Sequence, residues 1–84
     1  MIVEFEWDPR KAAANLVKHK VSFEEAGTAF GDPLGRIVTD PRHSSHEPRF
    51  VLLGSSKERR LLAVMFVDRG EVVRIIKRTQ GYEA

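Results

Sequence analysis

An arginine inside an apolar run, Arg74, is the residue whose placement in this sequence most needs a chemical explanation. Alternate residues of a strand share one sheet face, and those predicted to share a face with Arg74 are Val72, Ile76 and Arg78. A charged side chain beside a central strand is costly unless it has an anionic partner or faces a cleft. In a cleft, a guanidinium can hold a phosphate through two parallel hydrogen bonds. The alternative is an ion pair with one of three carboxylates: Glu4, Glu6 or Glu71.

A second group with chemical potential combines two cations with an imidazole, a group that titrates near neutral pH: Lys11, Lys18 and His19. They belong to a predicted helix, in which successive residues are rotated by about 100°. The side expected to face the core consists of Ala12, Ala13, Leu16 and Val17. The outer side carries Lys11, Asn15 and Lys18, with His19 at its edge. A solvated helix face is the commoner role of such a cationic stripe.

A possible metal site lies in a polar segment, where His43 and His46 are close in sequence to Asp40 and Glu47. Imidazole and carboxylate groups are zinc ligands. A lone His-x-x-His pair in a loop is weak evidence for a site, since nothing in the sequence fixes the geometry that a metal needs. The sequence therefore predicts a solvated loop and no metal or other cofactor.

The elements that position these residues begin with a strand and two helices. Alternation of apolar residues with glutamates over residues 2–7 predicts a strand with one wet face. Asp8 followed by Pro9 is a helix-start signal, and Ser22 with Glu25 is a capping box that opens a second helix. The second helix has one apolar face, formed by Phe23, Ala26, Gly27 and Phe30.

The remainder of the chain is predicted to be strands. A short segment, Gly35–Thr39, precedes three apolar runs: Arg49–Gly54, Arg60–Val67 and Glu71–Lys77. Asp68-Arg69-Gly70 suits a tight hairpin with glycine in a left-handed conformation. The uninterrupted apolar stretch Leu61–Val67 predicts a central strand buried on both faces. The expected fold class is α+β: one domain with a strand, two helices and then an antiparallel meander of three or four strands.

Composition and charge fit one small globular domain. The chain has 84 residues and no cysteine, so no disulfide stabilises it and a partner chain is one alternative source of stability. No apolar stretch approaches the roughly 20 residues that span a membrane, and the N-terminus lacks a secretion signal, so a cytoplasmic protein is expected. Residues 43–84 carry eight Lys/Arg against five Asp/Glu, which makes this half the more attractive to a polyanion.

The order of motifs along the chain resembles the BrnT family of bacterial toxins. The resemblance begins with Phe5-x-Trp7-Asp8-x-x-Lys11-x-x-x-Asn15-x-x-Lys18-His19 and Val21-Ser22-Phe23-Glu24-Glu25-Ala26. It continues with Asp32-Pro33, Glu47-x-Arg49, Gly54, Arg60-x-Leu62 and Val73-Arg74-Ile75-Ile76. Each motif alone is weak, but their joint order over residues 3–76 is fairly specific.

The resemblance implies a RelE-like fold and a metal-independent endoribonuclease that inhibits translation. It also implies a cognate antitoxin with a DNA-binding part, and a toxin–antitoxin complex that binds operator DNA. Metal-free RNA cleavage needs a base for the 2′-hydroxyl, cations for the phosphate charge and an acid for the departing 5′-oxygen. The expected catalytic residues are Arg74, Lys18 and His19, and the expected RNA-binding residues are Lys11, Arg49, Arg60 and Arg78. For Arg49 and Arg60, a surface ion pair is the alternative role.

Two departures from the family pattern affect the function expected of the chain. Lys20 stands where the family usually has glycine, and the C-terminus is expected to be shortened relative to relatives that continue into a charged helix. The alternative function is therefore a non-catalytic BrnT-like partner in a DNA-binding regulatory complex. An unrelated small α+β interaction domain is a third interpretation.

Overall fold

The elements of the fold follow the predicted order. The computed structural model describes residues 4–39 and 47–80, with the side chains of 77–80 left out. Its elements are β1 (Glu4–Glu6), α1 (Pro9–His19), α2 (Phe23–Thr28), the short 3-10 helix η1 (Ala29–Gly31), β2 (Arg36–Thr39), β3 (Arg49–Ser55), β4 (Leu61–Asp68) and β5 (Val72–Gln80). The α+β class is confirmed, and the candidate metal ligands His43 and His46 lie outside the described residues.

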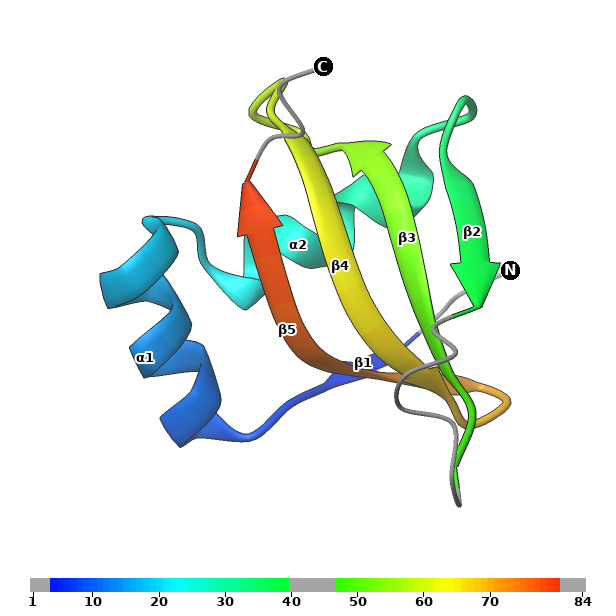
Figure 1. Ribbon diagram of the computed structural model, residues 1–84, viewed down its shortest axis with the longest axis horizontal. Helices are drawn as coiled ribbons and strands as arrows, with labels where there is room; N and C mark the ends of the chain where they lie inside the picture. Colours follow the sequence, from blue (N-terminus) through cyan, green and yellow to red (C-terminus); the bar gives the residue numbers. More distant parts are fainter. Residues whose placement is uncertain (1–3, 40–46, 81–84) are drawn as a thin grey trace.

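The sheet of the described residues has five strands in the order β1-β5-β4-β3-β2 (Figure 1). The three predicted apolar runs form its antiparallel centre and β4 is its middle strand, as expected. The predicted antiparallel meander is confirmed as β2–β5, and β1, whose place in the sheet the sequence did not predict, pairs with β5 in parallel. The alternation of polar and apolar residues shows which face of a strand is exposed to solvent, but it does not show which other strand pairs with it.

The core lies between α2 and one face of the sheet. Phe23 is 1% exposed and packs with buried residues of the central strands, among them Val64 and Phe66 at 0% and 4% exposure. Phe30 is half-buried, and its ring lies 4.9 Å from that of Phe66. The predicted packing of Phe23 and Phe30 on the sheet is therefore confirmed.

Helix α1 is oriented differently from the prediction. Leu16 and Val17, expected in the core, are 49% and 74% exposed, whereas Asn15 is only 7% exposed. The reason is a polar contact: the Asn15 amide donates a hydrogen bond to the carbonyl of Val21 (3.3 Å), just beyond the left-handed Lys20 (φ 63°). The Asn15 side of the helix faces β5, and Ala12 packs against the core as predicted, while Ala13, Leu16 and Val17 point away from it.

Local signals place the element boundaries correctly. The Asp8 carboxylate accepts a hydrogen bond from the Arg10 amide (2.8 Å), and the Ser22 hydroxyl accepts one from the Glu25 amide (3.0 Å). Gly70 has φ 83° in the β4–β5 hairpin, as the Asp-Arg-Gly sequence predicts. Among the described residues, no helix has both the length and the apolar character needed to cross a membrane.

Candidate functional site

The register of the strands brings Arg74 into one row with residues from three other strands. Arg49 pairs with Val67, Val67 with Arg74, and Arg74 with Glu6. The neighbours of Arg74 on β5, Val73 and Ile75, are buried under α2. Since side chains alternate along a strand, the row lies on the opposite sheet face. Two of the predicted site residues, Arg49 and Arg74, thus flank one buried valine on the same face.

The guanidinium of Arg74 is held by a carboxylate in this row. Its Nη1 lies 2.9 Å from Glu6 Oε2, and Arg69 Nη1 lies 3.7 Å from the same oxygen. Arg69 also pairs with Glu47 at 3.1 Å. The ion pair anticipated as the alternative for Arg74 therefore exists, with Glu6 as the partner. The Arg74 and Glu6 side chains are 36% and 40% exposed, and an exposed pair contributes only about 0–1 kcal/mol, so a phosphate could replace Glu6 at little cost.

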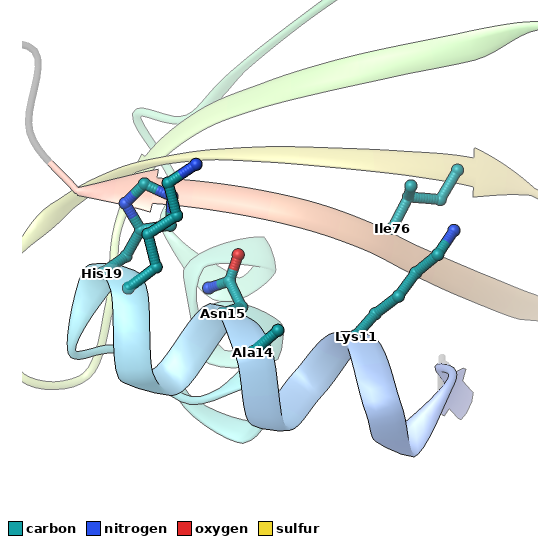
Figure 2. A pocket seen from close by; sticks show the side chains of 6 residues that line it. Lys11, Ala14, Asn15, His19 and Ile76 are labelled. Carbon is teal, nitrogen blue, oxygen red and sulfur yellow. The ribbon is translucent and has the colours of Figure 1, made fainter.

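The groove between α1 and β5 is bordered by three further predicted site residues, Lys11, Lys18 and His19. It encloses about 290 Å³ and is lined by Lys11, Ala14, Asn15, Lys18, His19 and Ile76. In Figure 2, the side chains of Lys11 and His19 extend from the helix toward β5. The predicted outer stripe of α1 is therefore partly wrong, because Lys11, Lys18 and His19 border a groove. None of the described residues that line it is acidic, so the groove is suited to an anion.

The expected catalytic residues lie on two elements, Arg74 on β5 and Lys18 and His19 on α1, and they do not meet at one point. Helix α1 follows β1 after two residues, so it begins beside the Arg74–Glu6 pair, and Figure 1 shows it running away from that end. At a rise of 1.5 Å per residue, the helix places His19 roughly 15 Å from its start. Arg74 thus lies at one end of a cationic strip beside β5, and Lys18 and His19 lie at the other end, with Ile76 between them.

One of the predicted RNA-binding residues, Arg60, stands apart from this strip. Arg60 binds Glu25 through both its Nε (3.0 Å) and its Nη2, and Ser56 Oγ donates to the same carboxylate at 2.5 Å. The hydrogen bond to Glu25 raises the pKa of Arg60 above its usual value. Arg60 therefore ties α2 to the β3–β4 turn. Arg78 pairs through its backbone with Val64, and its side chain is outside the described residues.

Because Glu25 is the hub of this network, Glu25→Ala is expected to lower the melting temperature by about 10 °C or more. The Glu25 side chain is 9% exposed, and its removal leaves the partly covered Arg60 and Ser56 without their acceptor. Thermal unfolding followed by circular dichroism measures the effect. Glu58→Ala, at an exposed position of the same turn, is the matched control, and equal melting temperatures for the two variants would contradict this role.

Sequence reasoning assigned no function to Glu6 beyond a possible ion pair, and it placed Asn15 on the solvent side. The wet-face pattern of β1 marked Glu6 as accessible, but no local signal indicates that β1 lies beside β5. Asn15 lies four residues before His19 on the lysine-rich side of the predicted helix. Its sequence context therefore does not distinguish it from a solvated polar residue. The described residues contain no cluster of His, Cys, Asp or Glu suited to a metal ion.

Comparisons with known proteins agree with the resemblance seen in the sequence. The model of a family described as "Ribonuclease toxin, BrnT, of type II toxin-antitoxin system" matches residues 7–78. The crystal structure of the Brucella abortus ribonuclease toxin BrnT matches with a TM-score of 0.68 at 18% identity, over 96% of this chain and 99% of that one. This likeness shows a shared fold. No curated protein sequence matches significantly. Because the family model spans most of its length, the chain belongs to the BrnT family of ribonuclease toxins of type II toxin–antitoxin systems.

Proposed function

We propose that this chain is a metal-independent endoribonuclease toxin that inhibits translation and is neutralised by a cognate antitoxin. The observation that supports this best is the Arg74–Glu6 pair at one end of a groove bordered by Lys11, Lys18 and His19. RNA is a polyanion that proteins bind chiefly through Lys and Arg at its phosphates. Arg49, in the same row as Arg74, adds a further phosphate contact to the strip. Because cellular RNA is the substrate, the proposed place of action is the cytoplasm.

The proposed reaction is an attack of the ribose 2′-oxygen on the adjacent phosphorus, with rupture of the bond to the 5′-oxygen of the next nucleotide. Glu6 takes the proton of the 2′-hydroxyl, and Arg74 stabilises the charge that builds on the phosphate oxygens. The two roles are coupled: once Glu6 is protonated, it holds Arg74 less strongly. The products are a 2′,3′-cyclic phosphate and a 5′-hydroxyl, whose proton comes from water or from a groove cation.

Lys18 and His19 were expected to take part in the chemical step, but their distance from Arg74 favours a binding role. We propose that they hold the RNA strand at the far end of the groove, with Lys11 between the two ends. Arg60 is left out of the proposed site, because two of its guanidinium nitrogens bind the largely buried Glu25 side chain and it does not line the groove. Arg78 remains a prediction, as does binding of the antitoxin complex to operator DNA.

His19→Ala is expected to raise KM for RNA several-fold while changing kcat by no more than about threefold. A residue that binds the strand equally in the ground and transition states contributes to KM and not to kcat. Steady-state cleavage measured from pH 5 to pH 9 separates the alternatives. A loss of about a hundredfold in kcat, together with a flattened pH profile near neutrality, would instead make His19 the acid or base.

Induction of the chain in growing cells tests the proposed function as a whole. Incorporation of a labelled amino acid is expected to fall within minutes of induction and to recover when the cognate antitoxin is co-expressed. The Arg74→Ala variant, shown to be folded and equally abundant, serves as the inactive control. Undiminished protein synthesis in cells that contain soluble wild-type chain would favour the alternative, a non-catalytic partner in a DNA-binding complex.

A further inference from the structure

The outward side of α1 carries an apolar stripe that the domain itself leaves uncovered. Ala13, Leu16 and Val17 are exposed and follow the i, i+3, i+4 spacing of a core-facing helix stripe. Leu16 is 49% and Val17 74% exposed. Isolated exposed apolar residues are ordinary on protein surfaces, but here they are neighbours on one helix. The spacing is that of a helix packed on another element, and on this side of α1 the described residues provide none.

The charges around this stripe have one sign. Arg10 lies on the same side of α1 as Val17, two turns before it and one turn before Ala13, and Lys20 follows the last turn. Residues 9–23 contain no aspartate or glutamate. Within the described part of the chain, the ion pairs of Arg60, Arg69 and Arg74 do not involve Arg10, Lys11 or Lys18. A complementary surface therefore needs apolar side chains flanked by carboxylates.

We propose, on the basis of the toxin function proposed above, that this outward side of α1 is where an acidic amphipathic helix of the cognate antitoxin docks. We call it the α1 face and define it by Ala13, Leu16 and Val17 with Arg10 and Lys20 at its border. An amphipathic helix suits it because apolar residues at i, i+3 and i+4 of one helix pack into the ridges and grooves of another. The charge of α1 selects an acidic partner over a second copy of this cationic helix.

The α1 face adjoins the RNA groove, and this has a consequence for inhibition. Lys18 follows Val17 directly and lines the groove, and Lys11 follows Arg10 and does the same. Carboxylates of a helix on the α1 face are thus placed to pair with the same lysines that RNA phosphates require. The antitoxin and RNA would then compete for these cations, so neutralisation needs no change in the fold of the toxin.

The test is the affinity of the purified chain for the antitoxin encoded beside its gene, measured by isothermal titration calorimetry. The double variant Leu16→Ser with Val17→Ser is expected to weaken Kd by about a hundredfold, because two apolar contacts are lost. Leu34→Ser is the matched control: Leu34 is 86% exposed and lies next to β2, at the far edge of the sheet from α1. Its Kd is expected to stay within about twofold of wild type. Arg10→Ala is expected to weaken binding several-fold and to reduce its dependence on salt.

An unchanged Kd in the folded double variant would overturn the proposal. So would a wild-type dimer that the double variant converts to monomers while antitoxin affinity stays the same, since the face would then belong to a second copy. Loss of RNA binding with unchanged antitoxin affinity would assign the face to RNA and also overturn it. Because the readout is binding, a chain without ribonuclease activity still gives a result, so failure of the docking proposal and failure of the proposed function are distinguishable.

Discussion

Arg74→Ala is expected to lower kcat for RNA cleavage by about a hundredfold to a thousandfold. The phosphorane-like transition state carries more negative charge on its equatorial oxygens than the ground state, so a prepositioned guanidinium favours it selectively. Arg74→Lys keeps the charge but loses the planar fork, and it is expected to restore only part of the rate. Single-turnover cleavage of an end-labelled RNA gives the rate of the chemical step.

The control for this experiment is Lys57→Ala, which removes one exposed cation from the β3–β4 turn. It lowers the net charge by the same amount as Arg74→Ala, so it reports any general electrostatic loss of RNA binding. Circular dichroism confirms that both variants are folded, and the weak exposed ion pair with Glu6 gives no reason for Arg74→Ala to unfold. Full activity in folded Arg74→Ala would remove this residue from the site.

Glu6→Gln is expected to lower kcat by about a hundredfold or more, the usual effect of losing a general base. The amide cannot take the 2′-hydroxyl proton, although it still hydrogen-bonds Arg74 and keeps the shape of the side chain. A general base acts in its deprotonated form, so the wild-type rate is expected to fall in acid. The pH–rate profile of the variant should lack this acidic limb.

A different outcome would assign Glu6 a different role. If Glu6 only holds Arg74 in the absence of RNA, Glu6→Gln would tighten RNA binding, leave kcat near the wild-type value and keep the acidic limb. Glu4→Gln, two residues earlier on the exposed edge of β1, is the matched control because it also removes one negative charge from this strand. Equal kcat for the two variants would contradict the assignment of the base.

The sequence predicted the elements well because their boundaries depend on neighbouring residues. The caps at Asp8 and Ser22, the Gly70 hairpin and the buried β4 are each determined within a few positions of the chain. The orientation of α1 could not be predicted in the same way. Periodicity shows which side of a helix is apolar, but not which side the rest of the protein covers, and in α1 the covered side is the one with Asn15.

The residue types of the candidate site could be predicted from the sequence, but their arrangement in space could not. Arg74 and Glu6 lie 68 positions apart, and they meet because β1 pairs in parallel with β5, for which no local signal exists. The same limit applies to Arg60 and Glu25, which are 35 positions apart. Each arginine had a phosphate and a carboxylate as alternative partners, and the structure supplies a carboxylate to both. We propose Arg74 as the RNA contact because it lies near the groove bordered by Lys11, Lys18 and His19, whereas Arg60 does not.

Cleavage of a labelled single-stranded RNA by the purified chain in the presence of EDTA tests the central proposal most directly. The expected result is cleavage at the same rate with and without EDTA, leaving 2′,3′-cyclic phosphate ends, because Arg74, Glu6 and the groove cations need no metal. Absence of cleavage by the folded wild-type chain would contradict the ribonuclease proposal. Cleavage abolished by EDTA and restored by a divalent metal would contradict the metal-free mechanism, and it would direct attention to His43 and His46.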